Sequence, residues 1–74
     1  MRILRMGSIG PAVELLQLAL NRAGFGELRQ DGIFSSATDN ALRRFQSVHG
    51  LTPDGVAGRD THRALLPWYT GYIM

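Results

Sequence analysis

Apolar residues at helical spacing mark the first element of the chain. Val13, Leu16 and Leu20 stand at positions i, i+3 and i+7, which places them on one face of a helix. Gly10-Pro11 precedes them, and proline is favoured at the first helical position because its missing N–H would have no partner there. Gly24 can adopt the left-handed conformation that ends many helices. We therefore predict a helix that begins at Gly10-Pro11 and is ended by Gly24.

A second amphipathic pattern predicts a helix that begins near Ser35 or Ser36 and ends at Gly50. Either serine can cap its start, because a serine hydroxyl accepts a hydrogen bond from an unpaired amide of the first turn. The inward face of this helix is expected to carry four apolar and two polar residues: Ala41, Leu42, Phe45 and Val48, with Thr38 and His49.

A shorter third helix is predicted from about Gly58 to Leu66. Pro67 is expected to end it, because proline disrupts the interior of a helix. The remaining residues, 67–74, are rich in aromatic side chains and are interpreted as a C-terminal tail or as a linker to a following module. The folded domain is expected to span residues 1–66.

The chain repeats an Asp-Gly turn that is followed by a helix. Residues 31–42 align with residues 54–65 through shared Asp, Gly, Thr, Ala and Leu positions. Glycine supplies backbone angles that other residues avoid, and aspartate bonds the amides of its own turn. Ile33 and Val56, which match each other, are expected to fill the core. The prediction is an all-α fold, a compact three-helix bundle with two Asp-Gly turn-plus-helix repeats.

Three side chains of the first helix need partners. Gln17 lies among the inward residues, and a buried amide without partners costs about 1–3 kcal/mol. It is expected to bond the backbone of a connecting loop, with a ligand-facing amide as the alternative, and Gln46 has the same two interpretations. Leu15 and Leu18 lie off the main stripe. Either the N-terminal segment or the aromatic tail covers them, or they dock onto a neighbouring domain.

Composition and charge exclude several classes of partner. The net charge is only +2, and the eight arginines are spread along the chain, which argues against a nucleic-acid partner. No apolar run approaches the roughly 20 residues of a membrane span, so no membrane partner is expected. The N-terminus does not resemble a signal peptide, which fits an excised domain or a parent protein exported without a standard signal.

No catalytic or metal-binding pattern is present in the sequence. There is no cysteine, and His49 and His62 lack the spacing of metal ligands. The serines lack the context of a nucleophile elbow, and the glycines form no phosphate-binding loop. We therefore predict no catalytic residue, no metal and no cofactor.

The ordered set of motifs resembles the peptidoglycan-binding domain 1 family. The resemblance rests on these residues: Leu4, Gly7, Gly10, Val13, Leu16-Gln17, Leu20, Gly24, Asp31-Gly32-Ile33-Phe34, Thr38, Ala41, Phe45-Gln46, Gly50-Leu51, Asp54-Gly55-Val56, Gly58, Thr61 and Leu65. There are two departures from the family pattern, Ser35 in place of a frequent glycine and His62 in place of a common aromatic residue. His62 is expected to weaken the packing of the last helix and to leave its surface more polar.

The resemblance implies a non-catalytic module that binds peptidoglycan and targets an attached cell-wall hydrolase or peptidase to it. It also implies a location in the cell wall, outside the cytoplasm, with a spore enzyme or a phage lysin among the possible parents. The aromatic tail is similar to the exit into a following catalytic or LysM-type module, and a monomer is expected. The alternative function is a docking domain that regulates its own enzyme partner.

The expected ligand contacts are five polar residues of the first connector and the second helix: Arg29, Asp31, Ser35, Ser36 and Asn40. These side chains and the amides at the helix start can bond sugar hydroxyls, N-acetyl groups or peptide carboxylates. The sequence leaves open whether the glycan or the stem peptide is recognised.

Overall fold

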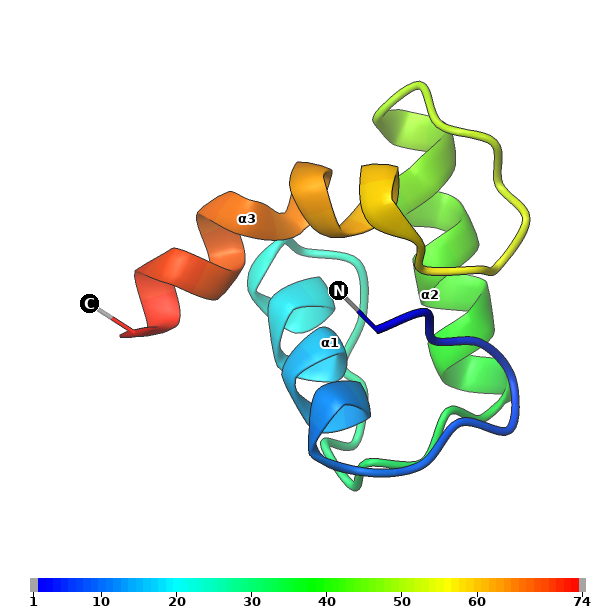
Figure 1. Ribbon diagram of the computed structural model, residues 1–74, viewed down its shortest axis with the longest axis vertical. Helices are drawn as coiled ribbons and strands as arrows, with labels where there is room; N and C mark the ends of the chain where they lie inside the picture. Colours follow the sequence, from blue (N-terminus) through cyan, green and yellow to red (C-terminus); the bar gives the residue numbers. More distant parts are fainter. Residues whose placement is uncertain (1, 74) are drawn as a thin grey trace.

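The chain folds into three helices joined by two connectors. The computed structural model describes residues 2–73, and it describes side-chain surroundings up to residue 69. Helix α1 spans Pro11–Arg22, α2 spans Ser36–Val48 and α3 spans Arg59–Ile73. In Figure 1, α3 runs across the view from α2 and its last turns extend past α1. Because α1 packs against both other helices, it is the centre of the predicted three-helix fold, which is confirmed.

Helices α1 and α2 begin and end where the sequence predicts. Pro11 stands at the start of α1, and Gly24, at φ 89°, lies just beyond its end. Ser35 precedes α2 in an extended conformation, but its side chain makes no capping hydrogen bond. Gly50, at φ 73°, follows α2 as Gly24 follows α1. Proline therefore marks the start of α1 and left-handed glycines mark the ends of α1 and α2, whereas α2 begins after Ser35 without a side-chain cap.

The prediction that Pro67 ends the third helix is wrong, because α3 continues through Pro67 to Ile73. A proline inside a helix removes one backbone hydrogen bond. The packing of the two residues that follow it compensates for this loss. Trp68 meets the Phe45 ring edge-on, with ring centroids 6.0 Å apart, and Tyr69 is buried in the core. Tertiary contacts thus maintain the helix beyond the proline.

The core is formed by one face of each helix and by the first connector. Its largest fully buried apolar side chains are Phe34, Phe45, Leu16, Leu20, Leu42 and Leu65. The prediction that Val48 joins this face is wrong, since Val48 is 70% exposed. Val48 is the last residue of α2 and lies beyond the stretch from Thr38 to Gln46 that contains the buried side chains of this helix.

Ile33 and Val56 do not fill the core as predicted. Ile33 is 53% exposed, whereas Phe34, one residue later, is 2% exposed. Val56 is partly buried, and its successor Ala57 is fully buried. Both residues lie in short extended stretches, where successive side chains point to opposite sides. The core position therefore falls one residue after the β-branched one.

A buried glutamine fastens each Asp-Gly turn to the helix before it. We name residues 28–38 the first unit and residues 51–61 the second unit. In the first unit, the Oε1 atom of Gln17 accepts a bond from the Gly32 amide at 3.0 Å. Its Nε2 atom lies 2.9 Å from the Ile33 carbonyl, 3.1 Å from the Thr38 hydroxyl and 3.3 Å from the Asp31 carboxylate. The expectation that Gln17 bonds a connecting loop is confirmed.

Gln46 repeats this arrangement in the second unit. Its Oε1 atom accepts from the Gly55 amide at 3.1 Å. Its Nε2 atom lies 3.0 Å from the Val56 carbonyl, 3.1 Å from the Thr61 hydroxyl and 3.2 Å from the Asp54 carboxylate. Each glutamine is 1% exposed. Each helix therefore fixes the start of the next one through a single side chain.

The N-terminal segment crosses both units. Leu4 exchanges backbone hydrogen bonds with Ala57 of the second unit, at 3.2 and 2.8 Å. Farther along the segment, the Gly10 amide bonds the Gly32 carbonyl at 2.9 Å, and Ile9 pairs with Ile33. The N-terminal segment, dark blue in Figure 1, therefore links the two Asp-Gly turns.

His62 closes the N-terminal segment onto α3, contrary to the expectation that it makes the surface more polar. The residue is 6% exposed. Its Nε2 atom lies 2.8 Å from the Arg2 carbonyl, which can only accept, so Nε2 carries the proton. In the neutral ring, Nδ1 then accepts from the Tyr69 hydroxyl, which lies 2.9 Å away. Burial raises the pKa of Tyr69 to about 12, which keeps this hydroxyl protonated.

Leu15 and Leu18 are only partly covered. Leu15 is 37% exposed and Leu18 is half-buried. Leu15 lines an apolar cavity of about 220 Å³ together with Leu4 of the N-terminal segment and Tyr69 of α3. The N-terminal segment and α3 therefore cover Leu15 in part, as predicted, and leave the rest of its side chain exposed.

No helix in the described part of the chain is long and apolar enough to cross a membrane.

Replacing Gln17 with alanine should lower the free energy of unfolding. The substitution leaves the buried Gly32 amide without its acceptor, which costs about 1–3 kcal/mol, or a fall of at least about 4 °C in melting temperature. Thermal and urea unfolding measure the loss. Gln30→Ala, at an exposed glutamine of the same connector, is the matched control. Equal stability of the two variants would contradict the role assigned to Gln17.

Gly55→Ala should destabilise the fold more than Gly50→Ala. Both glycines have nearly the same left-handed φ, 74° and 73°, so the backbone strain is shared. A Cβ atom at residue 50 meets nothing within 4 Å, whereas at residue 55 it meets the side chains of Asp39 and Arg43. These two form a 2.9 Å ion pair, and Arg43 also bonds the Pro53 carbonyl.

Displacing Asp39 and Arg43 should add about 1 kcal/mol to the loss in Gly55→Ala. Urea unfolding of the two variants side by side measures the difference. Equal losses would show that the ion pair moves aside without cost.

Candidate functional site

The five residues expected to contact ligand all lie on the surface of the first unit or just beyond it. Arg29 and Asp31 belong to the connector, Ser35 and Ser36 to the start of α2, and Asn40 to its second turn. All five side chains are exposed. Only Asp31 has its side chain engaged in the scaffold. The structure therefore places these residues along one connector and helix start, with four of them free of the core.

Asp31 holds its turn as a carboxylate. Its Oδ1 atom accepts from the Ile33 amide at 3.0 Å and from Gln17 at 3.3 Å. The Ile33 amide bond is the main cause that lowers the pKa of Asp31 below its usual value. Desolvation opposes it, and smaller lowering effects come from Gln17, from the amide of Asp31 itself and from the charge of Arg29. An exposed anion with a lowered pKa stays charged in neutral and mildly acidic solution.

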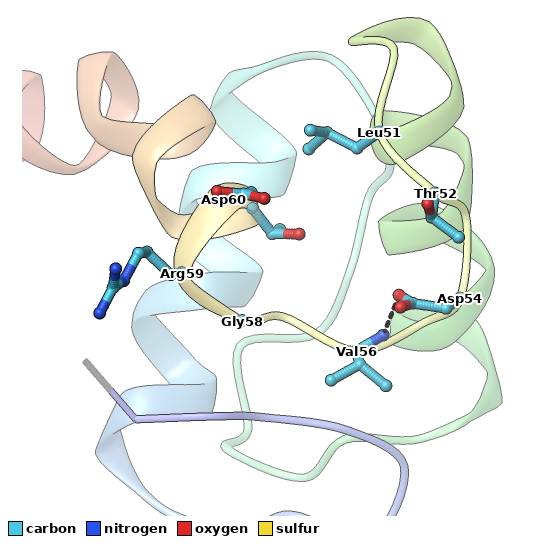
Figure 2. Close-up of a pocket in the computed structure, with 8 residues that line it drawn as sticks. Leu51, Thr52, Asp54, Val56, Gly58, Arg59 and Asp60 are labelled. Carbon is cyan, nitrogen blue, oxygen red and sulfur yellow. Dashed lines mark hydrogen bonds between the residues drawn. The ribbon is translucent and has the colours of Figure 1, made fainter.

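The largest hollow among those described lies in the second unit. This groove has a volume of about 460 Å³ and is lined by Leu51, Thr52, Asp54, Val56, Gly58, Arg59, Asp60 and Thr61. Figure 2 shows Thr52 and Asp54 on the connector and Asp60 on the first turn of α3, with Arg59 pointing away from the connector. The groove is thus an open space between a loop and the helix that the loop introduces.

The lining of the groove suits a polar ligand. Thr52 offers a hydroxyl, and Asp54 and Asp60 offer carboxylates that accept hydrogen bonds. Leu51 supplies an apolar side chain at the α2 end of the loop. Hydroxyls, amides and ammonium groups of a ligand find partners here. Within the described residues, no three His, Cys, Asp or Glu side chains are grouped to hold a metal ion.

The sequence expectation did not include this groove, although the repeat contained the signal. Shifting the expected residues by one repeat takes Arg29, Asp31, Ser35 and Ser36 to positions 52, 54, 58 and 59. All four shifted positions line the groove. Applying the expectation to both repeats would therefore have found it.

Three short helices, two equivalent turns and an open polar groove define a small helical binding domain. The chain belongs to the family described as putative peptidoglycan binding domain, whose model matches residues 9–65. This match confirms the resemblance drawn from the motifs.

Curated relatives place this domain in cell-wall enzymes. The chain is 46% identical to zinc D-Ala-D-Ala carboxypeptidase of Streptomyces albus G, over 74% of the chain and 22% of that protein. It is 37% identical to a spore cortex-lytic enzyme of Oceanobacillus iheyensis, over 88% of the chain and 24% of that protein. The chain spans about a quarter of the length of these relatives, so the similarity lies in a small part of each.

Solved structures share the fold. The SleB N-terminal domain superposes with a TM-score of 0.86 at 38% identity, and the match covers 89% of this chain and 90% of that one. The Burkholderia AP3 phage endolysin gives a TM-score of 0.83 at 44% identity, over 86% of this chain and 24% of that one. The first match is a domain of nearly the same extent, which confirms the predicted fold class.

Acid should weaken the fold partly through Asp31. Because its pKa is lowered in the folded state, its stabilising effect is present above the unfolded-state pKa of about 3.9 and is lost as the pH falls through the folded-state value. Asp31→Asn keeps an acceptor oxygen but does not titrate. Between about pH 5 and pH 2, the variant should lose less free energy of unfolding than the parent.

Urea unfolding at both pH values tests this, and an NMR titration of the Asp31 carboxyl gives its midpoint directly. A midpoint at or above the ordinary value of 3.8 would contradict the assigned hydrogen bonds.

Proposed function

We propose that the chain binds peptidoglycan and holds an attached cell-wall hydrolase or peptidase against it. The family match over residues 9–65 is the observation that carries this proposal. The polar groove of the second unit supports it, because hydroxyls and carboxylates can bond the sugars and peptides of the polymer. The enzymes among the relatives share only this small part with the chain, in keeping with a module that binds and does not catalyse.

A polymer ligand explains how a shallow surface is useful. The groove is open and small, so a single contact gives only modest affinity. Peptidoglycan repeats its chemical groups, and a tethered enzyme keeps the module near the next one, so weak contacts add up to retention. The parent protein would carry a catalytic or LysM-type module beside this domain, act as a monomer and work in the cell wall or the spore cortex, outside the cytoplasm.

We propose that the first unit contributes contacts through Arg29, Asp31, Ser35, Ser36 and Asn40. Four of these side chains are exposed and unused by the scaffold, so ligand binding does not compete with folding. Arg29 can bond a carboxylate of the stem peptide, and Asn40 can bond an N-acetyl group or a sugar hydroxyl.

Docking to the parent enzyme is the second candidate function. The apolar cavity beside Leu15, which also involves Leu4, Ala12 and Tyr69, favours it. Activity of the parent enzyme with and without this domain separates the two functions. A targeting module changes activity only on insoluble substrate, whereas a docking module also changes activity on soluble substrate.

Retention on insoluble peptidoglycan tests the main proposal. Purified sacculi should retain the domain in a pull-down, and Arg29→Ala and Asn40→Ala should each weaken retention several-fold, about 1 kcal/mol, without a lower melting temperature. Arg5→Ala, at an exposed arginine of the N-terminal segment, is the charge-matched control and should bind like the parent. Retention no greater than that of an unrelated domain of similar charge would refute the proposal.

A further inference from the structure

We infer that the domain carries two peptidoglycan subsites, one in each unit, and contacts two stretches of the same polymer at once. This inference rests on the proposed function and names the extent of its binding surface. The groove of the second unit is one subsite, and the matching surface of the first unit is the other.

The two units have the same internal geometry. The distances from the glutamine Nε2 atom to the carbonyl, hydroxyl and carboxylate acceptors are 2.9, 3.1 and 3.3 Å in the first unit and 3.0, 3.1 and 3.2 Å in the second. The turn aspartate accepts from the amide two residues later at 3.0 Å in the first unit and 2.9 Å in the second. The same backbone framework therefore presents both surfaces.

The pattern of exposure repeats as well. Nine of the eleven positions in residues 28–38 fall in the same burial class as their partners in residues 51–61, so the two units turn the same positions toward solvent. The exceptions are Ile33 and Ser35, which are exposed where Val56 and Gly58 are partly buried. Partial burial at those two positions fits the deeper hollow of the second unit. The two units therefore expose equivalent surfaces, and the surface of the first unit is the shallower of the two.

Each unit combines an arginine with the turn carboxylate and with hydroxyl or amide groups. In the first unit Arg29 lies on the connector beside Asp31. In the second unit the connector carries Asp54, and Arg59 lies at the start of α3, at the position equivalent to Ser36. A ligand that offers both acceptor and donor groups, as a muropeptide with sugar and stem peptide does, can bond either set. The second unit adds Asp60 and the open groove, so it is the stronger subsite.

The N-terminal segment fixes the spacing of the two subsites. Leu4 pairs with Ala57 in the second unit and Ile9 pairs with Ile33 in the first. These two pairs are five residues apart along the segment, with a turn at residues 6 and 7 between them, so the residues that form them lie at most about 18 Å apart. A single polymer strand can therefore reach both subsites, and a rigid spacing limits the entropy lost when the second contact forms.

Titration with a defined soluble muropeptide, followed by NMR of backbone amides, tests the inference on the whole chain. Saturation should shift the amides of both units, for example Asp31 and Ser36 in the first and Asp54 and Arg59 in the second. The second unit should saturate at lower concentration. Because a free muropeptide bridges nothing, the two sets of shifts should follow independent binding curves.

Blocking variants at equivalent positions sharpen the test. Ser35 and Gly58 each stand just before a helix; Ser35 makes no capping bond, and a Cβ atom at Gly58 meets nothing within 4 Å. Ser35→Gln and Gly58→Gln should each remove the shifts of their own unit and keep those of the other. Each should reduce affinity for insoluble peptidoglycan by about tenfold or more, because the polymer loses its second contact. Ser47→Gln, at an exposed serine outside both units, should change neither the NMR shifts nor the affinity for insoluble peptidoglycan.

Three outcomes overturn the inference, and they separate it from the proposed function. Shifts confined to one unit at saturation, with retention on sacculi intact, leave the function and refute the second subsite. Shifts away from both units do the same. No shift and no retention refute both. If a blocking variant does not fold, its own spectrum shows this, and the titration of the parent chain still decides.

Discussion

A buried primary amide is the constraint on which the rest of this structure depends. Gln17 and Gln46 lie in the core with 1% exposure, so each of their polar atoms needs a partner inside the protein. The partners that bond these amides among the described residues belong to the next turn and the next helix. Satisfying the amide therefore fixes the glycine amide, the aspartate and the threonine of that turn at the same time. With no disulfide in the chain, these networks set the angles between helices that a core of this size would hold only loosely.

The Asp-Gly pairs provide the partners that the buried glutamine amides require. Gly32 and Gly55 have φ values of 75° and 74°, which turn their amides toward the glutamine oxygens. The aspartates close the turns and leave their outer oxygens to solvent. Scaffold and surface thus come from the same residues: the inner side of each turn holds the fold, and the outer side is open to solvent. A binding surface built in this way needs no flexible loop.

Much of the fold follows from local sequence, and the failures have identifiable physical causes. Pro11, Gly24 and Gly50 set helix ends through their own backbone preferences, so α1 and α2 were predicted well. Pro67 was misjudged because its effect depends on Trp68 and Tyr69 packing against distant residues. His62 was misjudged because its partner, the Arg2 carbonyl, is 60 residues away in sequence. The groove was missed because a hollow forms between a loop and a helix, and only the repeat register points to it.

The register of the repeat also shows how the last helix differs from the first two. One repeat length beyond Gln46 is Tyr69, so the last helix has a phenol where a third unit would need an amide. The Tyr69 hydroxyl bonds back to His62 on its own helix instead of reaching forward to a following turn. Helix α3 is therefore held by the Gln46 amide of the helix before it, and at the equivalent position its own side chain bonds within the helix. Tyr69 and His62 thus resemble the capping positions of repeat proteins, where the last repeat is atypical.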